Sequence, residues 1–122
     1  GLDTARYYPK YTTPDDGNLL PDAELHDAIA SLGITEDTMV VVYGKGQCIP
    51  MTSARVVWAL MYAGVKDVRL LDGGFKAWLR HGGPLADKAR QPVGVPRFNE
   101  TGACAHQYLA TTAEVAAVVA AE

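Results

Sequence analysis

The chain has 122 residues, of which 48% are hydrophobic and 20% charged, and its formal net charge is −3 at pH 7. This length and composition indicate one compact globular domain at most. The net charge argues against a nucleic-acid partner, because such proteins concentrate Lys and Arg on one face, whereas here the basic residues are scattered singly. No apolar run approaches the length that crosses a bilayer, so we expect no membrane partner. The sequence leaves the cellular compartment open.

Two cysteines, Cys48 and Cys104, are too few for a disulfide framework, and no C-x-x-C pair suggests zinc. Cys104 and His106 form a C-x-H pair, but two ligands without a second pair are weak evidence for a metal. We therefore expect neither a metal site nor a cofactor. A bridge between the two cysteines stays open, because separation in sequence does not set the distance between their Cα atoms.

The first half of the chain predicts a helix followed by a strand. Residues 1–20 show no sustained period and predict an irregular lead-in. From 22 to 32 the apolar positions recur at helical spacing, and Gly33 is placed to end that helix. The run T-M-V-V-V-Y at 38–43 predicts a strand covered on both faces, which is typical of parallel sheets.

The next elements repeat the order strand, turn, helix. Residues 53–63 predict a largely buried helix that ends at Gly64, and 68–71 predict a second strand. A turn at 72–74 precedes a short helix with an apolar stripe. This alternation predicts the right-handed crossovers of a parallel α/β sheet, in which functional loops follow the C-terminal ends of the strands. The large aromatic side chains are expected in the core, namely Trp58, Phe75 and Trp78.

The remainder predicts a loop and then one more helix. Residues 86–105 are rich in Pro and Gly and have little periodicity, which is typical of a linker. Thr111 and Glu114 have the spacing of a capping box, and three valines behind them form an apolar stripe. Two strands cannot form an independent sheet that is buried on both faces, so we expect this fold to be completed by further chain at both ends.

The segment V-x-L-L-D-G-G-F-x-x-W-L-x-x-G-x-P-L at 68–85, with the strand at 40–43 and the helix at 53–63, resembles the second half of a rhodanese domain. The resemblance covers about residues 19–86, and the opening signature of the family is not found upstream. It implies a rhodanese-like parallel sheet flanked by helices, here incomplete, within a tandem protein. The implied organisation is a partial domain at 1–86, a linker at 87–108 and the start of a following repeat at 109–122.

The resemblance also implies a persulfide loop between the first strand and the helix that follows it, here residues 44–52. A thiolate is the nucleophile in such a loop, and a helix N-terminus lowers the pKa of a thiol. Counted back from the helix, Cys48 lies where active rhodaneses place the catalytic cysteine; counted forward from the strand, that place is Gly44. The longer loop resembles the non-catalytic domains of tandem rhodaneses, which favours Cys48 as a small loop residue over Cys48 as the sulfur carrier.

Lys45 and Arg55 are the candidate substrate-binding residues, since both are cations near a helix N-terminus. Their alternatives are a solvated loop lysine and an arginine that holds a carboxylate of a neighbouring domain. The resemblance implies part of a thiosulfate- or mercaptopyruvate-type sulfurtransferase that moves sulfane sulfur through a cysteine persulfide, with this piece mainly structural. The expected partners are a small anionic sulfur donor and the remaining rhodanese domains, on the same or a separate chain. An inactive rhodanese-like binding module is the alternative.

Overall fold

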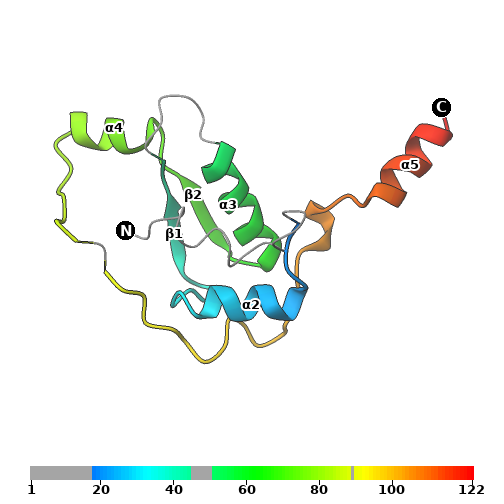
Figure 1. Ribbon diagram of the computed structural model, residues 1–122, viewed down its shortest axis with the longest axis horizontal. Coiled ribbons are helices and arrows are strands. Elements are labelled where there is room, and N and C mark those ends of the chain that lie inside the picture. The colour runs from blue at the N-terminus through cyan, green and yellow to red at the C-terminus, as the bar shows by residue number, and fades with distance from the viewer. Residues whose placement is uncertain (1–17, 45–50, 89) are drawn as a thin grey trace.

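The computed structural model describes residues 18–44, 51–88 and 90–122 (Figure 1). Helices and strands alternate in the first two thirds of the chain, as the sequence predicts. A short 3-10 helix and one further helix follow near the C-terminus. The elements in chain order are α2 (Asp22–Ala30), β1 (Met39–Val42), α3 (Met51–Ala63), β2 (Asp67–Leu70), α4 (Gly74–Arg80), η2 (His106–Tyr108) and α5 (Thr112–Ala120).

The two strands pair in parallel, in a register that sets Met39 against Asp67 and Val42 against Leu70. The backbone N–H of Leu71 donates to the carbonyl of Val42 at 2.8 Å and so extends the ladder by one bond. Parallel neighbours need a crossover, and α3 supplies it. The predicted α/β class with a parallel sheet is therefore confirmed for the described residues.

The core lies where α2, α3 and one face of the strand pair meet. α2 contributes the spaced apolar positions that the sequence predicts for an amphipathic helix, and α3 contributes one of its faces. Apolar burial of this kind contributes roughly 25 cal/mol for each Å² removed from water. The core cluster is formed by Leu25, Ile29, Ala30, Leu32, Ile34, Val42, Val56, Leu60, Tyr62, Ala63, Val65 and Phe98.

Two expectations about burial are wrong. β1 was expected to be covered on both faces, yet Met39 is 58% and Val41 is 47% exposed, because α3 covers one face and no described element covers the other. Trp78 was expected in the core, but it is 40% exposed. Its indole N–H donates to the carbonyl of Pro84 at 3.0 Å, so its ring lies on the turn that follows α4.

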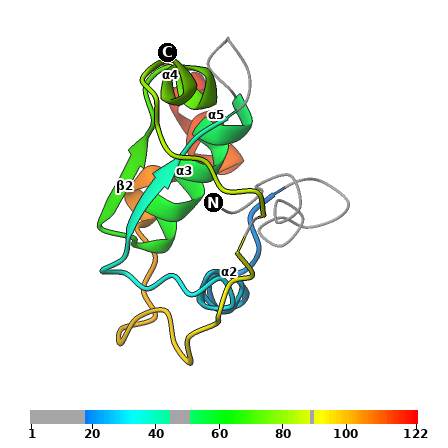
Figure 2. The ribbon, with the colours of Figure 1, turned by 90° about the vertical axis from the view of Figure 1, so that its left-hand side faces the viewer.

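The stretch expected to be a linker packs in part against the core. Its chain runs beneath α2 in both views (Figures 1 and 2). The backbone N–H of Val95 donates to the carbonyl of Ala30 at 2.9 Å, and Phe98 is only 3% exposed. The domain boundaries stay a prediction, but residues 95–98 clearly belong to the packed body.

α5 begins with the predicted capping box. The hydroxyl of Thr111 accepts from the backbone N–H of Glu114 at 3.2 Å, and the Glu114 carboxylate accepts from the backbone N–H of Thr111 at 2.7 Å. No residue of α5 is buried, and the helix projects from the rest of the molecule (Figure 1). Its valine stripe therefore has no partner among the described residues.

Candidate functional site

The C-terminal edge of the strand pair brings two helix N-termini together. Gly44 follows β1 and Met51 begins α3, while the turn after β2 leads directly into α4 at Gly74. Figure 1 shows the starts of α3 and α4 at the same end of the sheet. In parallel α/β sheets this is the edge at which ligands bind, because the connecting loops and helix N-termini converge there.

Contacts at this edge tie the end of β1 to the start of α4. The backbone N–H of Phe75 donates to the carbonyl of Gly44 at 3.0 Å. The rings of Tyr43 and Phe75 stack with centroids 6.1 Å apart. Gly74 has φ +59°, and a Cβ added there would lie 2.7 Å from the carbonyl oxygen of Gly44. The approach of the two backbones therefore requires glycine.

The first turn of α3 carries no acidic residue, so its N-terminal dipole is not offset by a carboxylate. Arg55 in the next turn is half-buried, and its guanidinium carbon lies 4.5 Å from the centroid of the Trp58 ring. This is a cation–π contact. The indole N–H of Trp58 in turn donates to the carbonyl of Tyr108 at 2.8 Å.

Of the three predicted site residues, Arg55 is the one that the described part of the structure includes. Arg55 lies on α3, and its role as a ligand of an anion stays a prediction. Lys45 and Cys48 lie outside the described residues.

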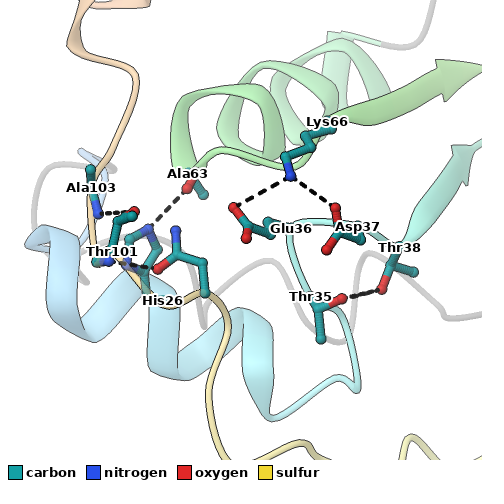
Figure 3. A network of polar contacts seen from close by, with 11 residues as sticks. His26, Thr35, Glu36, Asp37, Thr38, Ala63, Lys66, Thr101 and Ala103 are labelled. Carbon is teal, nitrogen blue, oxygen red and sulfur yellow. Dashed lines mark hydrogen bonds and ion pairs between the residues drawn. The ribbon is translucent and has the colours of Figure 1, made fainter.

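A second polar cluster lies at the opposite end of α3. The ring of His26 reaches from α2 to the carbonyl of Ala63, with Nε2 at 2.9 Å (Figure 3). A carbonyl only accepts, so Nε2 donates. The sulfur of Cys104 lies 3.4 Å from the same nitrogen, and Phe98 stacks on the His26 ring at 4.8 Å. Thus one buried histidine joins α2, α3 and the C-terminal segment.

A network of three side chains, Asp22, Tyr62 and His106, lies next to the His26 cluster and nearer to the surface. The hydroxyl of Tyr62 donates to Oδ1 of Asp22 at 2.9 Å, and Nδ1 of His106 lies 3.3 Å from the same hydroxyl. Nε2 of His106 lies 3.1 Å from Oδ2 of Asp22. The backbone N–H of Ala105 donates to the carbonyl of Tyr62 at 2.7 Å. These contacts fix the segment before η2 to both helices.

A third group of charges holds the loop before β1 to the start of β2. Nζ of Lys66 lies 2.9 Å from Oδ1 of Asp37 and 4.0 Å from Oε2 of Glu36 (Figure 3). The lysine is exposed, so solvent screens both pairs and their contribution to stability is small. Their effect is to orient the loop rather than to build a site.

The environment of Cys104 makes it a poor nucleophile. Burial raises the pKa of its thiol from 9.0 to about 12, and the charge of Asp22 and a hydrogen bond to it add to the shift. Burial likewise raises the pKa of Tyr62 from 10.0 to about 12, again with help from Asp22. Since the thiolate is the reactive form, Cys104 is unsuited to carry sulfur at neutral pH.

Cys104 and His106, the C-x-H pair that is weak evidence for a metal in the sequence, do not converge on a common ligand position. Cys104 lies against His26, whereas His106 lies against Asp22 and Tyr62. Within the described ranges, no group of three or more His, Cys, Asp or Glu residues is arranged to hold a metal ion. None of the helices in that part of the chain is long and apolar enough to cross a bilayer.

Comparisons with known proteins agree on one family. The family described as "Rhodanese-like domain" matches residues 3–81, and this match begins upstream of the segment 19–86 in which the motifs are visible. Thiosulfate sulfurtransferase YnjE of Escherichia coli is 44% identical over 84 residues, which are 64% of this chain and 19% of that protein. Thiosulfate sulfurtransferase of Cricetulus griseus is 36% identical over 81 residues, 66% of this chain and 27% of that protein.

A solved structure is also similar to this chain. It is a variant of EanB in a cysteine-persulfide, tetrahedral intermediate state with ergothioneine, and it superimposes with a TM-score of 0.70 at 29% identity. The superposition covers 84% of this chain and 26% of the EanB chain. The chain thus spans only about a fifth to a quarter of the length of the relatives that it matches.

Proposed function

Because the chain belongs to the rhodanese-like domain family, we propose that it is part of a thiosulfate- or mercaptopyruvate-type sulfurtransferase, which moves sulfane sulfur through a cysteine persulfide. The observation that carries the proposal is the position of the α3 N-terminus beside the end of a parallel strand, with no carboxylate in its first turn. This is an environment in which a thiolate and an anionic donor are both stabilised. The relatives named as thiosulfate sulfurtransferases support the same chemistry.

The proposed reaction has two displacement steps. A thiolate attacks the outer sulfur of thiosulfate; one S–S bond forms, the S–S bond of the donor breaks, and sulfite leaves with the electron pair. A nucleophilic acceptor then attacks the outer sulfur of the persulfide and regenerates the thiolate. Neither step requires an oxidant, a metal or a cofactor. In this scheme the protein provides a thiol of low pKa and positive charge for the anions, for which Lys45 and Arg55 are the proposed residues.

In the first arrangement that we propose, this piece is structural and the nucleophile lies elsewhere in the protein. The test is Cys48→Ser in the full-length protein. We expect sulfur transfer from thiosulfate to cyanide to keep at least half of the wild-type rate, because the loop of residues 44–52 resembles non-catalytic domains. A loss of a hundredfold or more in the folded variant contradicts this arrangement.

A second arrangement, in which Cys48 carries the sulfur, is favoured by one observation. The chain has two cysteines, and burial raises the pKa of Cys104 to about 12. Cys48 is therefore the remaining candidate for the nucleophilic thiol. The test is intact-mass spectrometry of the chain after thiosulfate treatment, with Cys48→Ser and Cys104→Ser as matched variants. A gain of one sulfur atom that persists in Cys104→Ser and disappears in Cys48→Ser supports this arrangement. No gain in the wild-type chain contradicts it.

The proposed macromolecular partner is a further rhodanese domain of the same protein, on the same or a separate chain. The observation behind it is the exposed valine stripe of α5, in which Val118 is 66% exposed. We expect Val118→Asp to lower the stability of the full-length protein while leaving the chain of 122 residues unchanged. Equal unfolding midpoints for wild type and variant in the full-length protein contradict the proposal. The alternative, an inactive rhodanese-like module that docks a partner through the loop face at residues 44–52, would instead bind its partner without any sulfur transfer.

A further inference from the structure

The segment of residues 104–109 connects α5 to the rest of the molecule. It is bonded to α3 at two points: the backbone N–H of Ala105 donates to the carbonyl of Tyr62 at 2.7 Å, and the indole N–H of Trp58 donates to the carbonyl of Tyr108 at 2.8 Å. η2 lies between these two points, at the base of α5 (Figure 1). Because no residue of α5 is buried, the attachment of this segment determines how α5 leaves the body.

One side chain of the segment, His106, contacts both α2 and α3. Its Nε2 lies 3.1 Å from Oδ2 of Asp22, and its Nδ1 lies 3.3 Å from the hydroxyl oxygen of Tyr62. The rings of Tyr62 and His106 meet edge to face, with centroids 5.5 Å apart. The side chain of His106 is 67% exposed, so its imidazole exchanges protons with the solvent while it contacts both partners.

The three side chains share too few protons when His106 is neutral. The hydroxyl of Tyr62 has one proton, and it donates that proton to Oδ1 of Asp22 at 2.9 Å. The carboxylate of Asp22 accepts, and the tyrosine oxygen then accepts through its lone pairs. Both ring nitrogens of His106 therefore face acceptors, and both contacts become hydrogen bonds when the imidazole carries two protons. A neutral imidazole has one N–H, so it loses one contact or draws the Tyr62 proton away from Asp22.

The other titratable groups around this network differ from His106 in one respect each. Tyr62 and Cys104 keep their protons between pH 5.5 and 8, because burial and the neighbouring Asp22 raise the pKa of each to about 12. His26 contacts Cys104, but it is only 7% exposed and its Nε2 donates to the carbonyl of Ala63. Histidine is the side chain that ordinarily changes charge in this pH range, and of the two histidines it is His106 that faces Asp22.

We propose that His106 is a pH-sensitive clamp: the protonated imidazole ties residues 104–109 to α2 and α3, and the neutral imidazole holds that segment and the base of α5 less tightly. This inference concerns a change in conformation and goes beyond sulfur transfer. Its consequence for the geometry between two repeats rests on the proposed partner of α5. The clamp itself depends neither on that partner nor on which cysteine carries sulfur.

The test is amide hydrogen exchange of the full-length protein at pH 5.5 and pH 8, followed by mass spectrometry and corrected for the intrinsic exchange rate at each pH. Peptides that contain Ala105 and Tyr108 report the clamp. A peptide that contains Val95, whose N–H donates to the carbonyl of Ala30, reports the overall stability at each pH. Relative to that peptide, we expect the protection of residues 105–109 to be about threefold or more higher at pH 5.5, because the neutral imidazole gives up one hydrogen bond.

Two variants identify the histidine that causes the difference. His106→Gln keeps a polar side chain that cannot gain a charge, and His81→Gln is the matched control at an exposed histidine after α4. We expect His106→Gln to lose the pH difference and to show, at both pH values, no more protection than the wild type at pH 8. We expect His81→Gln to match the wild type.

Two outcomes overturn the proposal. One is equal protection of residues 105–109 at both pH values in the wild type. The other is a pH difference that persists in His106→Gln, since a second group such as His26 would then cause it. A full-length protein that transfers no sulfur refutes the proposed activity, while the exchange data still decide on His106.

Discussion

Replacing Phe98 with Ala tests whether the Pro- and Gly-rich segment stabilises the fold. Phe98 is 3% exposed, is part of the core cluster and stacks on His26 at 4.8 Å. Truncation of a buried Phe to Ala costs about 3–5 kcal/mol, because transfer energy is lost and a cavity is left. Partial collapse of the loop onto the cavity would reduce this, so we expect about 3 kcal/mol. The assay is urea unfolding followed by far-UV circular dichroism.

The matched control is Val93→Ala in the same segment, where the side chain is 84% exposed and the expected cost is under about 0.5 kcal/mol. With a slope of roughly 1–3 kcal/mol per M of urea, the difference of about 2.5 kcal/mol between the variants should make the Phe98 variant unfold about 0.8 M or more below the control. Equal midpoints for the two variants would refute the reasoning, because residues 95–98 would then contribute nothing to the core.

Three further predictions concern the C-terminal half. Tyr62→Phe should cost about 1–3 kcal/mol, since it removes a hydrogen bond to the charged Asp22, and in a double-mutant cycle with Asp22→Asn the two costs should not add. The folded-state pKa values of Tyr62 and Cys104 both lie above their ordinary values of 10.0 and 9.0, at about 12. The contribution of these two groups to folding stability is therefore full below pH 9 and is lost as the pH rises toward 12, and urea midpoints at successive pH values should fall over that range. Thr111→Ala should reduce the helicity of α5, seen in amide hydrogen exchange, by removing a cap worth about 1 kcal/mol, while the urea midpoint stays unchanged because α5 buries nothing.

The elements that sequence reasoning predicted are those whose signal is local. α2 and α3 have apolar residues at helical spacing and are followed by Gly33 and Gly64. The capping box of α5 is recognisable from the spacing of Thr111 and Glu114. β1 and β2 are short runs between turn residues. Periodicity and end signals are properties of neighbouring residues, so one sequence is enough to detect them.

Burial was predicted less well, because it depends on which elements pack together. Phe98 stands among Pro, Gly and polar residues with no period around it, yet it is fully enclosed by the body of the molecule. Trp78 lies in an apolar stripe, yet its indole bonds to the turn after its own helix. In both cases tertiary contacts determine how far the side chain is buried, and the neighbouring residues in the sequence do not indicate those contacts.

The polar cluster around His26 was not predicted for a similar reason. Its members come from α2, the end of α3 and the segment before η2, so their separations in sequence are long and follow no motif. The Cys104–His106 pair was visible in the sequence as weak evidence for a metal site, and in the structure the two side chains contact different partners. Sequence reasoning had no means of linking His26 to Cys104, which are 78 positions apart.

The polarity of α3 explains why thiols at its two ends should differ in chemistry. The helix has 13 residues and so is about 20 Å long, and in the sequence Cys48 precedes its first residue, Met51, by three positions. Cys104 lies at its C-terminus, near the carbonyl of Ala63 and the carboxylate of Asp22, where burial and negative charge keep the proton on sulfur. The N-terminal end has the opposite sign, since its free N–H groups stabilise anions. One helix can thus hold an inert thiol at its buried C-terminal end and still favour a thiolate at the edge where we propose that a sulfur donor binds.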